Sequence, residues 1–358
     1  FANGTLASVV SPLSINSDDK SLIQGSCFSD VAGQQPLKKA LEIAAAGGHH
    51  LMMIGPPGVG KTMLASRLSS ILPPINPFQT HPIRSMFSSY EGQECIAALS
   101  GIRRVELIDR NLTKRELFGS TGTAHLRAWL MEEHINRKSA YPTGLLSKEV
   151  GAFYRSSGGV LFLDEFSSYP IKVTDQLLQQ MDHHLVQVIL AMNPCPCGNF
   201  NHPEKTCGCS AGTLNNYQKK LTAAWKDRLD MTIYTQPELW SDESQEASSE
   251  IKSRVKRAWK IQMERQGRQN SQLSTAALEG VCLMGKSSWR YFYRECSSQK
   301  VSIRAQQSLL ALSRTLADLQ GDKSVNNSHI KSALGLRLND RSSITSRDVK
   351  EANSKQPV

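Results

Sequence analysis

Residues 51–62 read LMMIGPPGVGKT, a short apolar run followed by a glycine-rich segment. The run has the length and continuous apolarity of a buried strand, and the segment from Gly55 to Thr62 matches G-x4-G-K-[ST]. In such a loop the backbone N–H groups wrap phosphates, the lysine meets the β- and γ-phosphates, and the hydroxyl ligates Mg2+. The pattern therefore predicts an ATP site. Its predicted binding residues are Gly55, Pro56, Pro57, Gly58, Val59, Gly60, Lys61, Thr62 and Met63.

A second apolar run, Val160 to Leu163, ends in two carboxylates, Asp164 and Glu165. We expect Asp164 to share the Mg2+ shell with Thr62, and Glu165 to orient or polarise the attacking water. Acidic pairs after apolar runs are common in proteins. Joined to the phosphate loop, however, this pair predicts hydrolysis of ATP as well as binding.

The order of the other elements favours an α/β fold with a parallel sheet. We predict a helix over 34–46, a second helix from residue 61, and strands at 160–164 and 186–193. Continuous apolar strands that alternate with helices are typical of sheets covered on both faces. From about residue 245 onward the pattern is helical.

Four segments of the chain together resemble one family. Three of them are GQQPLKKALEIAAAGGHHLMMIGPPGVGKTMLASRL, GGVLFLDE and AMNPCPCG, and the fourth, VSIRAQQSLLALSRTLADL, is similar to the lid of that family. The chain resembles the Mg-chelatase-like AAA+ ATPases, most closely the ComM/YifB branch, over roughly 28–335. The resemblance implies a three-layer AAA+ P-loop NTPase domain with a parallel sheet, followed by a smaller α-helical lid domain.

The resemblance also implies a domain organisation. We expect a linker or remnant of a preceding domain at 1–27, the nucleotide-binding domain at 28–240 with a Cys-rich insert at 195–209, the lid at 241–340, and a tail at 341–358. Between Gln180 and Val186 the chain has only MDHHL, where the family inserts a β-hairpin.

Three further catalytic residues come from the resemblance alone. Asn193 takes the sensor role of positioning the hydrolytic water, beside Lys61, Asp164 and Glu165. Arg228 matches the arginine finger that reaches the γ-phosphate of a neighbouring subunit, and Arg304 matches the second sensor arginine of the lid. Charge that develops on the γ-phosphoryl oxygens needs such a guanidinium. The resemblance thus implies a ring, a homo-hexamer, with ATP bound between subunits.

Four of the eight cysteines lie close together in the sequence, as Cys195-Pro-Cys197 and Cys207-Gly-Cys209. Four thiolates around one ion form the closed tetrahedral shell of structural zinc, so the pattern predicts a Zn2+ site. Four cysteines leave no open coordination position, which argues against catalytic zinc at this set. The alternative is four free thiols on an exposed turn.

The net charge of +10 is concentrated in one part of the chain. Residues 252–304 hold 12 basic and 3 acidic side chains, and four aromatic residues lie among the later ones. Such a patch fits phosphates and unpaired bases, but it equally fits a solvated helix face and a small lid core. The aromatic residues are Trp289, Tyr291, Phe292 and Tyr293.

Other features of the sequence point away from membranes and metal-binding histidines. No run reaches the roughly 18 apolar residues of a membrane span, and the first residues lack the order of a signal peptide, so we expect a cytoplasmic protein without a membrane partner. The histidine pairs at 49–50 and 183–184 lack carboxylate or cysteine partners at metal spacing, and we expect them in loops.

The leading functional hypothesis is an ATP-hydrolysing ring motor on DNA, in single-stranded, duplex or branched form, resembling the branch-migration helicase of natural transformation and recombination. An alternative is a Mg-chelatase-type or protein-remodelling ATPase without direct action on DNA. A third is a degenerate ATP-binding scaffold.

Overall fold

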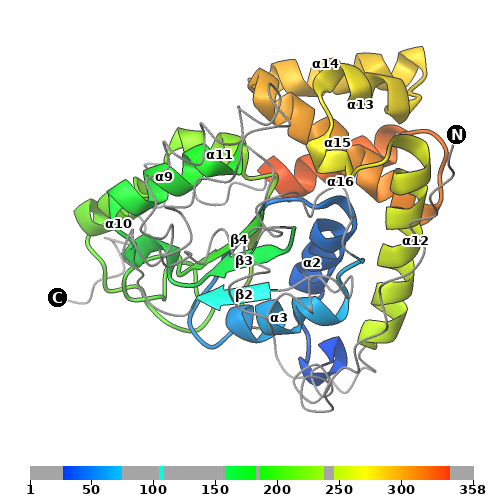
Figure 1. The fold of residues 1–358 in the computed structure, drawn as a ribbon. Coiled ribbons are helices and arrows are strands. Elements are labelled where there is room, and N and C mark those ends of the chain that lie inside the picture. The colour runs from blue at the N-terminus through cyan, green and yellow to red at the C-terminus, as the bar shows by residue number, and fades with distance from the viewer. Residues whose placement is uncertain are drawn as a thin grey trace, which may run out of the picture.

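The computed structural model describes residues 27–74, 105–108, 156, 158–182, 186–237 and 246–338. Within this part of the chain, parallel strands form a five-stranded sheet in the order β2-β3-β4-β1-β5 (Figure 1). The strands are β1 (Leu51–Ile54), β2 (Val105–Ile108), β3 (Val160–Leu163), β4 (Gln187–Met192) and β5 (Met231–Tyr234).

Helices cover both faces of this sheet. Leu51 and Met53 of β1 belong to one buried cluster, whereas Met52 and Ile54 belong to another. Alternate residues of one strand are therefore buried on opposite sides, which explains why the strand is apolar throughout. The first cluster is covered by α2 (Gln35–Gly47), α3 (Lys61–Arg67) and η2 (Leu68–Ser70), and the second by η5 (Phe166–Ser168), α9 (Ile171–Met181), α10 (Ala211–Gln218) and α11 (Ala223–Arg228).

The predicted α/β fold class is confirmed, and the two predicted helices and three strands of this part are present. Two strands were not predicted. The β5 segment, Met-Thr-Ile-Tyr, alternates in burial and holds three residue types that favour strands, but four alternating residues are too short a run to predict a strand, and its pairing along β1 from Leu51↔Met231 onward establishes it. The short β2 pairs with β3 in the same way.

The C-terminal part is helical, as predicted, and packs directly on the α/β part (Figure 1). Its central helix contacts α2 as well as its own neighbours, and one buried apolar cluster runs from Leu41 of α2 to Leu312 and Leu316. The elements are α12 (Ser248–Gln266), η6 (Asn270–Gln272), α13 (Thr275–Cys282), α14 (Lys286–Ser298), the central α15 (Ile303–Gln320) and α16 (Asn327–Leu338); at the other end, η1 (Phe28–Asp30) precedes α2.

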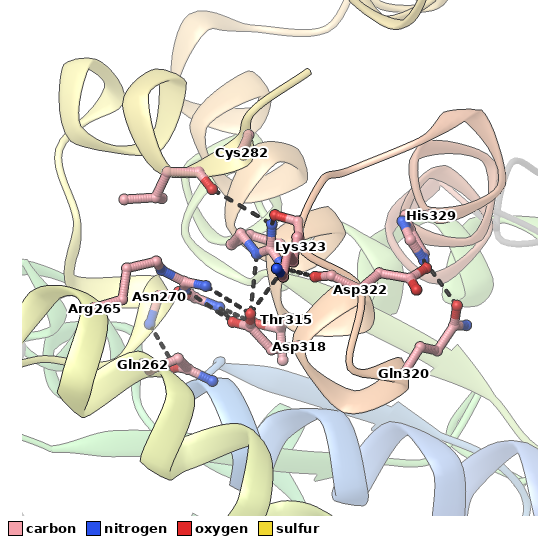
Figure 2. Close-up of polar contacts among 12 residues, drawn as sticks. Gln262, Arg265, Asn270, Cys282, Thr315, Asp318, Gln320, Asp322, Lys323 and His329 are labelled. Carbon is pink, nitrogen blue, oxygen red and sulfur yellow. Dashed lines mark hydrogen bonds and ion pairs between the residues drawn. The ribbon is translucent and has the colours of Figure 1, made fainter. Parts of the chain in front are cut away.

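A buried polar network holds the helical part together (Figure 2). The Asp318 carboxylate accepts hydrogen bonds from both terminal nitrogens of Arg265, at 2.7 and 2.9 Å, from Arg314 Nε at 3.1 Å and from Asn270 Nδ2 at 2.9 Å. The Asp318 side chain is 0% exposed and that of Arg314 is 1% exposed. A charge so far from water is tolerated only because its oxygens are fully partnered.

We therefore predict that Asp318→Ala lowers the free energy of unfolding by about 3–5 kcal/mol, since it leaves the buried Arg314 guanidinium without its carboxylate partner. Chemical denaturation measures this loss. The matched control is Glu264→Ala, which breaks the exposed Lys260–Glu264 pair and should leave the midpoint unchanged. Equal midpoints for the two variants would contradict the prediction.

The prediction of loop histidines is confirmed for the first pair, because His49 and His50 lie between the end of α2 and the start of β1, but their burial was not predicted. His49 and His50 are 0% and 8% exposed. His49 Nε2 lies 2.8 Å from Thr315 Oγ1 and its Nδ1 lies 3.5 Å from Asp230 Oδ2, while the backbone N–H of His50 donates to the same carboxylate. This partner, Asp230, directly precedes β5, a strand that the sequence did not predict. The pair at 183–184 lies outside the described residues.

No helix in the described part of the chain combines the length and the apolarity needed to span a bilayer.

Candidate nucleotide-binding site

The predicted phosphate loop joins β1 to α3. Gly58 and Gly60 take left-handed φ angles of 83° and 90°, which a residue with a side chain adopts at a cost in free energy. A Cβ on Gly55 would come within 2.8 Å of the carbonyl oxygen of Thr235, so the loop also starts where only glycine fits. Pro57 and Gly58 are exposed, and Met63 is 49% exposed, whereas Pro56 and Val59 are buried.

Lys61 lies over the loop that precedes it. Its Nζ donates to the carbonyl oxygens of Gly55 at 2.7 Å and Pro56 at 2.9 Å, and to Asn193 Oδ1 at 3.3 Å. Burial lowers the pKa of Lys61 to about 8, although the Asp164 carboxylate raises it. The site thus holds an ammonium group that gains from the approach of an anion such as a phosphate.

Thr62, Asp164 and Glu165 meet at the same edge of the sheet. The Thr62 hydroxyl donates to Asp164 Oδ2, and the other carboxylate oxygen accepts from the backbone N–H of Glu165 at 2.8 Å. A hydroxyl and a carboxylate already in contact are the ligand types that Mg2+ takes beside a triphosphate. Glu165 is exposed and has a φ of 48°, an uncommon conformation for a residue with a side chain.

Asn193 follows directly after β4, which lies between β3 and β1 as expected. The strands are parallel, so Asn193 emerges at the edge that also carries the phosphate loop and Asp164. Its contact with Lys61 brings the predicted sensor residue to the predicted phosphate site.

The four clustered cysteines converge in the structure. All four sulfur atoms lie within 4.8 Å of one another, and Cys195 Sγ lies 3.3 Å from Cys197 Sγ and 3.8 Å from Cys207 Sγ. Four sulfurs at the usual zinc distance of about 2.3 Å from a tetrahedral ion would be about 3.8 Å apart, so the set fits this ion. The loop also touches the phosphate loop, because a Cβ on Gly198 would come 2.6 Å from Pro57 Cδ.

Arg228 and Arg304 lie together on Asp182, which follows α9. Arg228 donates from Nε and Nη2 to the two carboxylate oxygens at 3.0 and 2.9 Å, and Arg304 Nη2 donates to Oδ1. Burial raises the pKa of Asp182, but the hydrogen bonds from both arginines outweigh burial and hold this pKa below its usual value.

This arginine pair is remote from the phosphate loop of the same chain. Asp182 precedes β4 and Arg228 precedes β5, so both lie at the edge where the parallel strands begin. Lys61 lies beyond the edge where β1 ends. Strands of four to six residues separate these edges by about 13–20 Å. The structure thus brings Lys61, Thr62, Asp164, Glu165 and Asn193 together and keeps both arginines apart from them.

The basic residues of the lid divide into two groups. Arg254 pairs with Glu42 and Glu246, and Arg265 pairs with Asp318, so these two serve the fold. Apart from Arg304, which pairs with Asp182, the exposed cations of α12 to α15 are Lys252, Lys256, Arg257, Lys260, Arg268, Lys286, Arg290, Arg294 and Lys300.

The aromatic residues of α14 divide in a similar way. Phe292 is buried in the apolar cluster, with Trp289 and Tyr291 partly buried against it. Tyr293 is 49% exposed and stacks on Trp289 with ring centroids 5.5 Å apart. Core packing therefore accounts for Phe292, and a flat aromatic surface remains at Tyr293.

The sequence did not predict two residues that contact the candidate site residues, namely Asp182 and Tyr217. Asp182 holds the arginine pair, and Tyr217 donates to the carbonyl oxygen of Asn193 at 3.1 Å. Neither belongs to a local motif. Both contacts join residues 24 or more positions apart, so only the folded arrangement identifies them.

Comparison with known families gives a consistent result across the chain. The model of magnesium chelatase, subunit ChlI, matches residues 27–128 and 117–243, and the model of the C-terminal part of the same subunit matches residues 245–337.

Individual relatives are similar over most of the chain. The competence protein ComM of Haemophilus influenzae is 30% identical over 331 residues, which are 87% of this chain and 60% of that protein. The protein YifB of Salmonella typhimurium is 31% identical over 334 residues, with the same shares, and YifB of Escherichia coli is 30% identical over 336 residues, 88% of this chain and 61% of its own length. The chain therefore spans about three fifths of the length of these relatives.

Proposed function

Because the chain belongs to the magnesium-chelatase-like family of AAA+ ATPases, in its ComM/YifB branch, we propose that it is an ATP-hydrolysing ring motor that acts on DNA, resembling the branch-migration helicase of natural transformation and recombination. One observation supports the ring in this proposal. The phosphate loop and the arginine pair lie at opposite edges of the same sheet, which favours a site completed by two copies of the chain. A ring supplies such a junction for every subunit.

In this proposal each residue has a defined task. Lys61 and the loop N–H groups hold the β- and γ-phosphates, and Thr62 and Asp164 hold Mg2+, which neutralises charge on the phosphates when bound. Glu165 orients the attacking water with the help of Asn193. Arg228 of a neighbouring subunit stabilises the charge that develops on the γ-phosphoryl oxygens, and Arg304 acts at the same junction. A homo-hexamer is the expected assembly.

DNA is the proposed substrate of the motor because the lid presents exposed cations on α12 and an exposed aromatic face on α14. Lys252 and Lys256 are exposed one turn apart on α12, and such cations bind phosphates by releasing counterions. Tyr293 supplies an aromatic face on which an unpaired base can stack.

The test compares ATP turnover with and without branched DNA, for the wild-type chain and for Lys61→Ala. We expect DNA to stimulate turnover of the wild type and binding to weaken steeply with salt. Turnover unchanged by DNA, with no salt-dependent binding, would contradict the DNA proposal and favour the protein-remodelling ATPase that the magnesium chelatase match suggests.

A pair of lid variants makes this test specific. The double variant Lys252→Gln with Lys256→Gln should weaken DNA binding. It should also reduce the slope of the logarithm of the binding constant against the logarithm of the salt concentration, by about one for each phosphate that the two lysines neutralise in the wild type. The control, Lys172→Gln with Lys331→Gln, removes the same charge from exposed positions on α9 and α16 and should bind DNA as the wild type does.

We also propose that Cys195, Cys197, Cys207 and Cys209 hold a structural Zn2+ that stiffens the loop between Asn193 and α10. The purified chain should then contain about one zinc per molecule, measured by atomic emission. Cys207→Ser should lower this content, and Cys27→Ser, which alters a cysteine outside the cluster, should not. Zinc-free protein with all four thiols titratable would contradict the assignment.

A further inference from the structure

Tyr217 of α10 connects the two segments that carry the water-positioning residues. Its hydroxyl donates to the backbone carbonyl of Asn193 at 3.1 Å and accepts from Ser167 Oγ at 2.7 Å. Ser167 belongs to η5, the short turn that begins immediately after Glu165. One phenol group therefore bridges the end of β4 and the turn that follows β3.

Both bridged segments need such support. Glu165 has a φ of 48°, and residues in this region persist only where their surroundings hold them. Here Ser168 donates from its backbone N–H to the Glu165 carbonyl at 2.7 Å, and Phe166 packs edge-on against Trp225 at 4.8 Å between ring centroids. Asn193 on the other side contacts Lys61 through its side chain. The bridge thus couples the turn of Glu165 to the residue that touches the phosphate lysine.

The helix that carries Tyr217 is itself fixed at both ends. Ser210 caps its N-terminus by accepting from the backbone N–H of Thr213 at 3.2 Å. Just beyond its C-terminus, Lys220 donates from Nζ to the carbonyl oxygen of Ser167. The phenol is therefore held in place by its helix and does not depend on the bridge for its own position.

Tyr217 remains a hydrogen-bond donor under working conditions. Burial raises the pKa of Tyr217 above its usual value. The phenol therefore keeps its proton at neutral pH and can donate to the Asn193 carbonyl.

We propose that Tyr217 is a positioning residue for ATP hydrolysis, whose phenol sets the spacing between the Glu165 turn and Asn193 so that both meet the same water. The inference rests on the proposed ATPase activity. It assigns Tyr217 no contact with ATP. Loss of its hydroxyl should therefore affect the chemical step and leave nucleotide binding intact.

The test compares Tyr217→Phe with Tyr234→Phe in the full chain. Both phenols are partly buried against the same apolar cluster, but Tyr234 makes neither of the two bridging contacts. We expect Tyr217→Phe to lower kcat about tenfold, which corresponds to about 1.4 kcal/mol, with the KM for ATP within about twofold and a Tm equal to that of Tyr234→Phe. Ser167→Ala, which removes the other half of the bridge, should lower kcat as well.

Several outcomes would overturn the inference. These are a kcat equal to that of Tyr234→Phe, a loss confined to KM, or a loss in Tyr217→Phe with none in Ser167→Ala. Wild type and Glu165→Gln are measured beside the variants. If Glu165→Gln hydrolyses ATP as fast as the wild type, the proposed function fails; if it is inactive and Tyr217→Phe matches Tyr234→Phe, only the role of Tyr217 fails.

Discussion

Arg228→Ala is expected to lower the kcat of ATP hydrolysis by about 10³-fold or more, with ATP affinity within about twofold of the wild type. The reason is geometric. Arg228 lies on Asp182 at the edge of the sheet where strands begin, whereas the phosphate loop lies at the edge where they end. In the proposed ring, the guanidinium would stabilise the transition state in a neighbouring subunit and would contribute nothing to nucleotide binding by its own subunit.

Mixing of inactive variants tests this arrangement directly. Arg228→Ala retains its phosphate loop and Lys61→Ala retains its arginine, so a junction that combines the two has every catalytic group. If the two variants are mixed in equal amounts and assemble at random, roughly a quarter of the junctions should hold both an intact phosphate loop and an intact Arg228. Turnover should then return to roughly a quarter of the wild-type value. Lys172→Ala, which removes an exposed cation of α9, is the charge-matched control. A mixture no more active than its components would rule out catalysis by Arg228 in trans.

Glu165→Gln should lower kcat by about 10²- to 10⁴-fold while ATP remains bound. Glu165 is exposed beside the site, and Thr62 and Asp164 carry the predicted Mg2+ contacts without it. The amide keeps the size of the carboxylate but cannot accept a proton from the attacking water. Single-turnover kinetics and nucleotide-binding measurements separate the two effects. The comparison is Lys61→Ala, which should lose ATP binding itself.

Hydrolysis that is slow in the wild type and unchanged in Glu165→Gln would contradict this role. The chain would then be an ATP-binding scaffold, in which the Asp164–Glu165 pair has only a structural part.

The predictable part of the site consists of features contained in short segments. The G-x4-G-K-[ST] loop, its flanking strand and helix, and the two carboxylates after β3 are each contiguous in the sequence. Their geometry follows from local rules: glycines reach left-handed φ angles, and parallel strands deliver their carboxyl ends to one edge. The four cysteines belong to the same class, since their spacing within one loop limits how far apart the sulfurs can lie.

Other features depended on partners that periodicity cannot identify. The distribution of charged residues along the sequence predicts a basic lid. In the structure, however, Arg254 and Arg265 form ion pairs with carboxylates of the fold. His49 lies in a loop as expected, but its burial was not predicted, because its carboxylate partner, Asp230, is distant in the sequence and is brought close only by the pairing of β5 with β1. Hydrophobic periodicity reports which face of an element is buried and not which element covers it.

The sequence by itself determined that this chain has a phosphate loop, a carboxylate pair and a parallel α/β sheet, because each is specified by neighbouring residues. Only the tertiary structure decided that Arg228 and Arg304 share Asp182 at the far edge of that sheet, and that Tyr217 joins the turn of Glu165 to Asn193. These contacts link residues between 24 and 122 positions apart, and their geometry exists only after the sheet and its covering helices have packed.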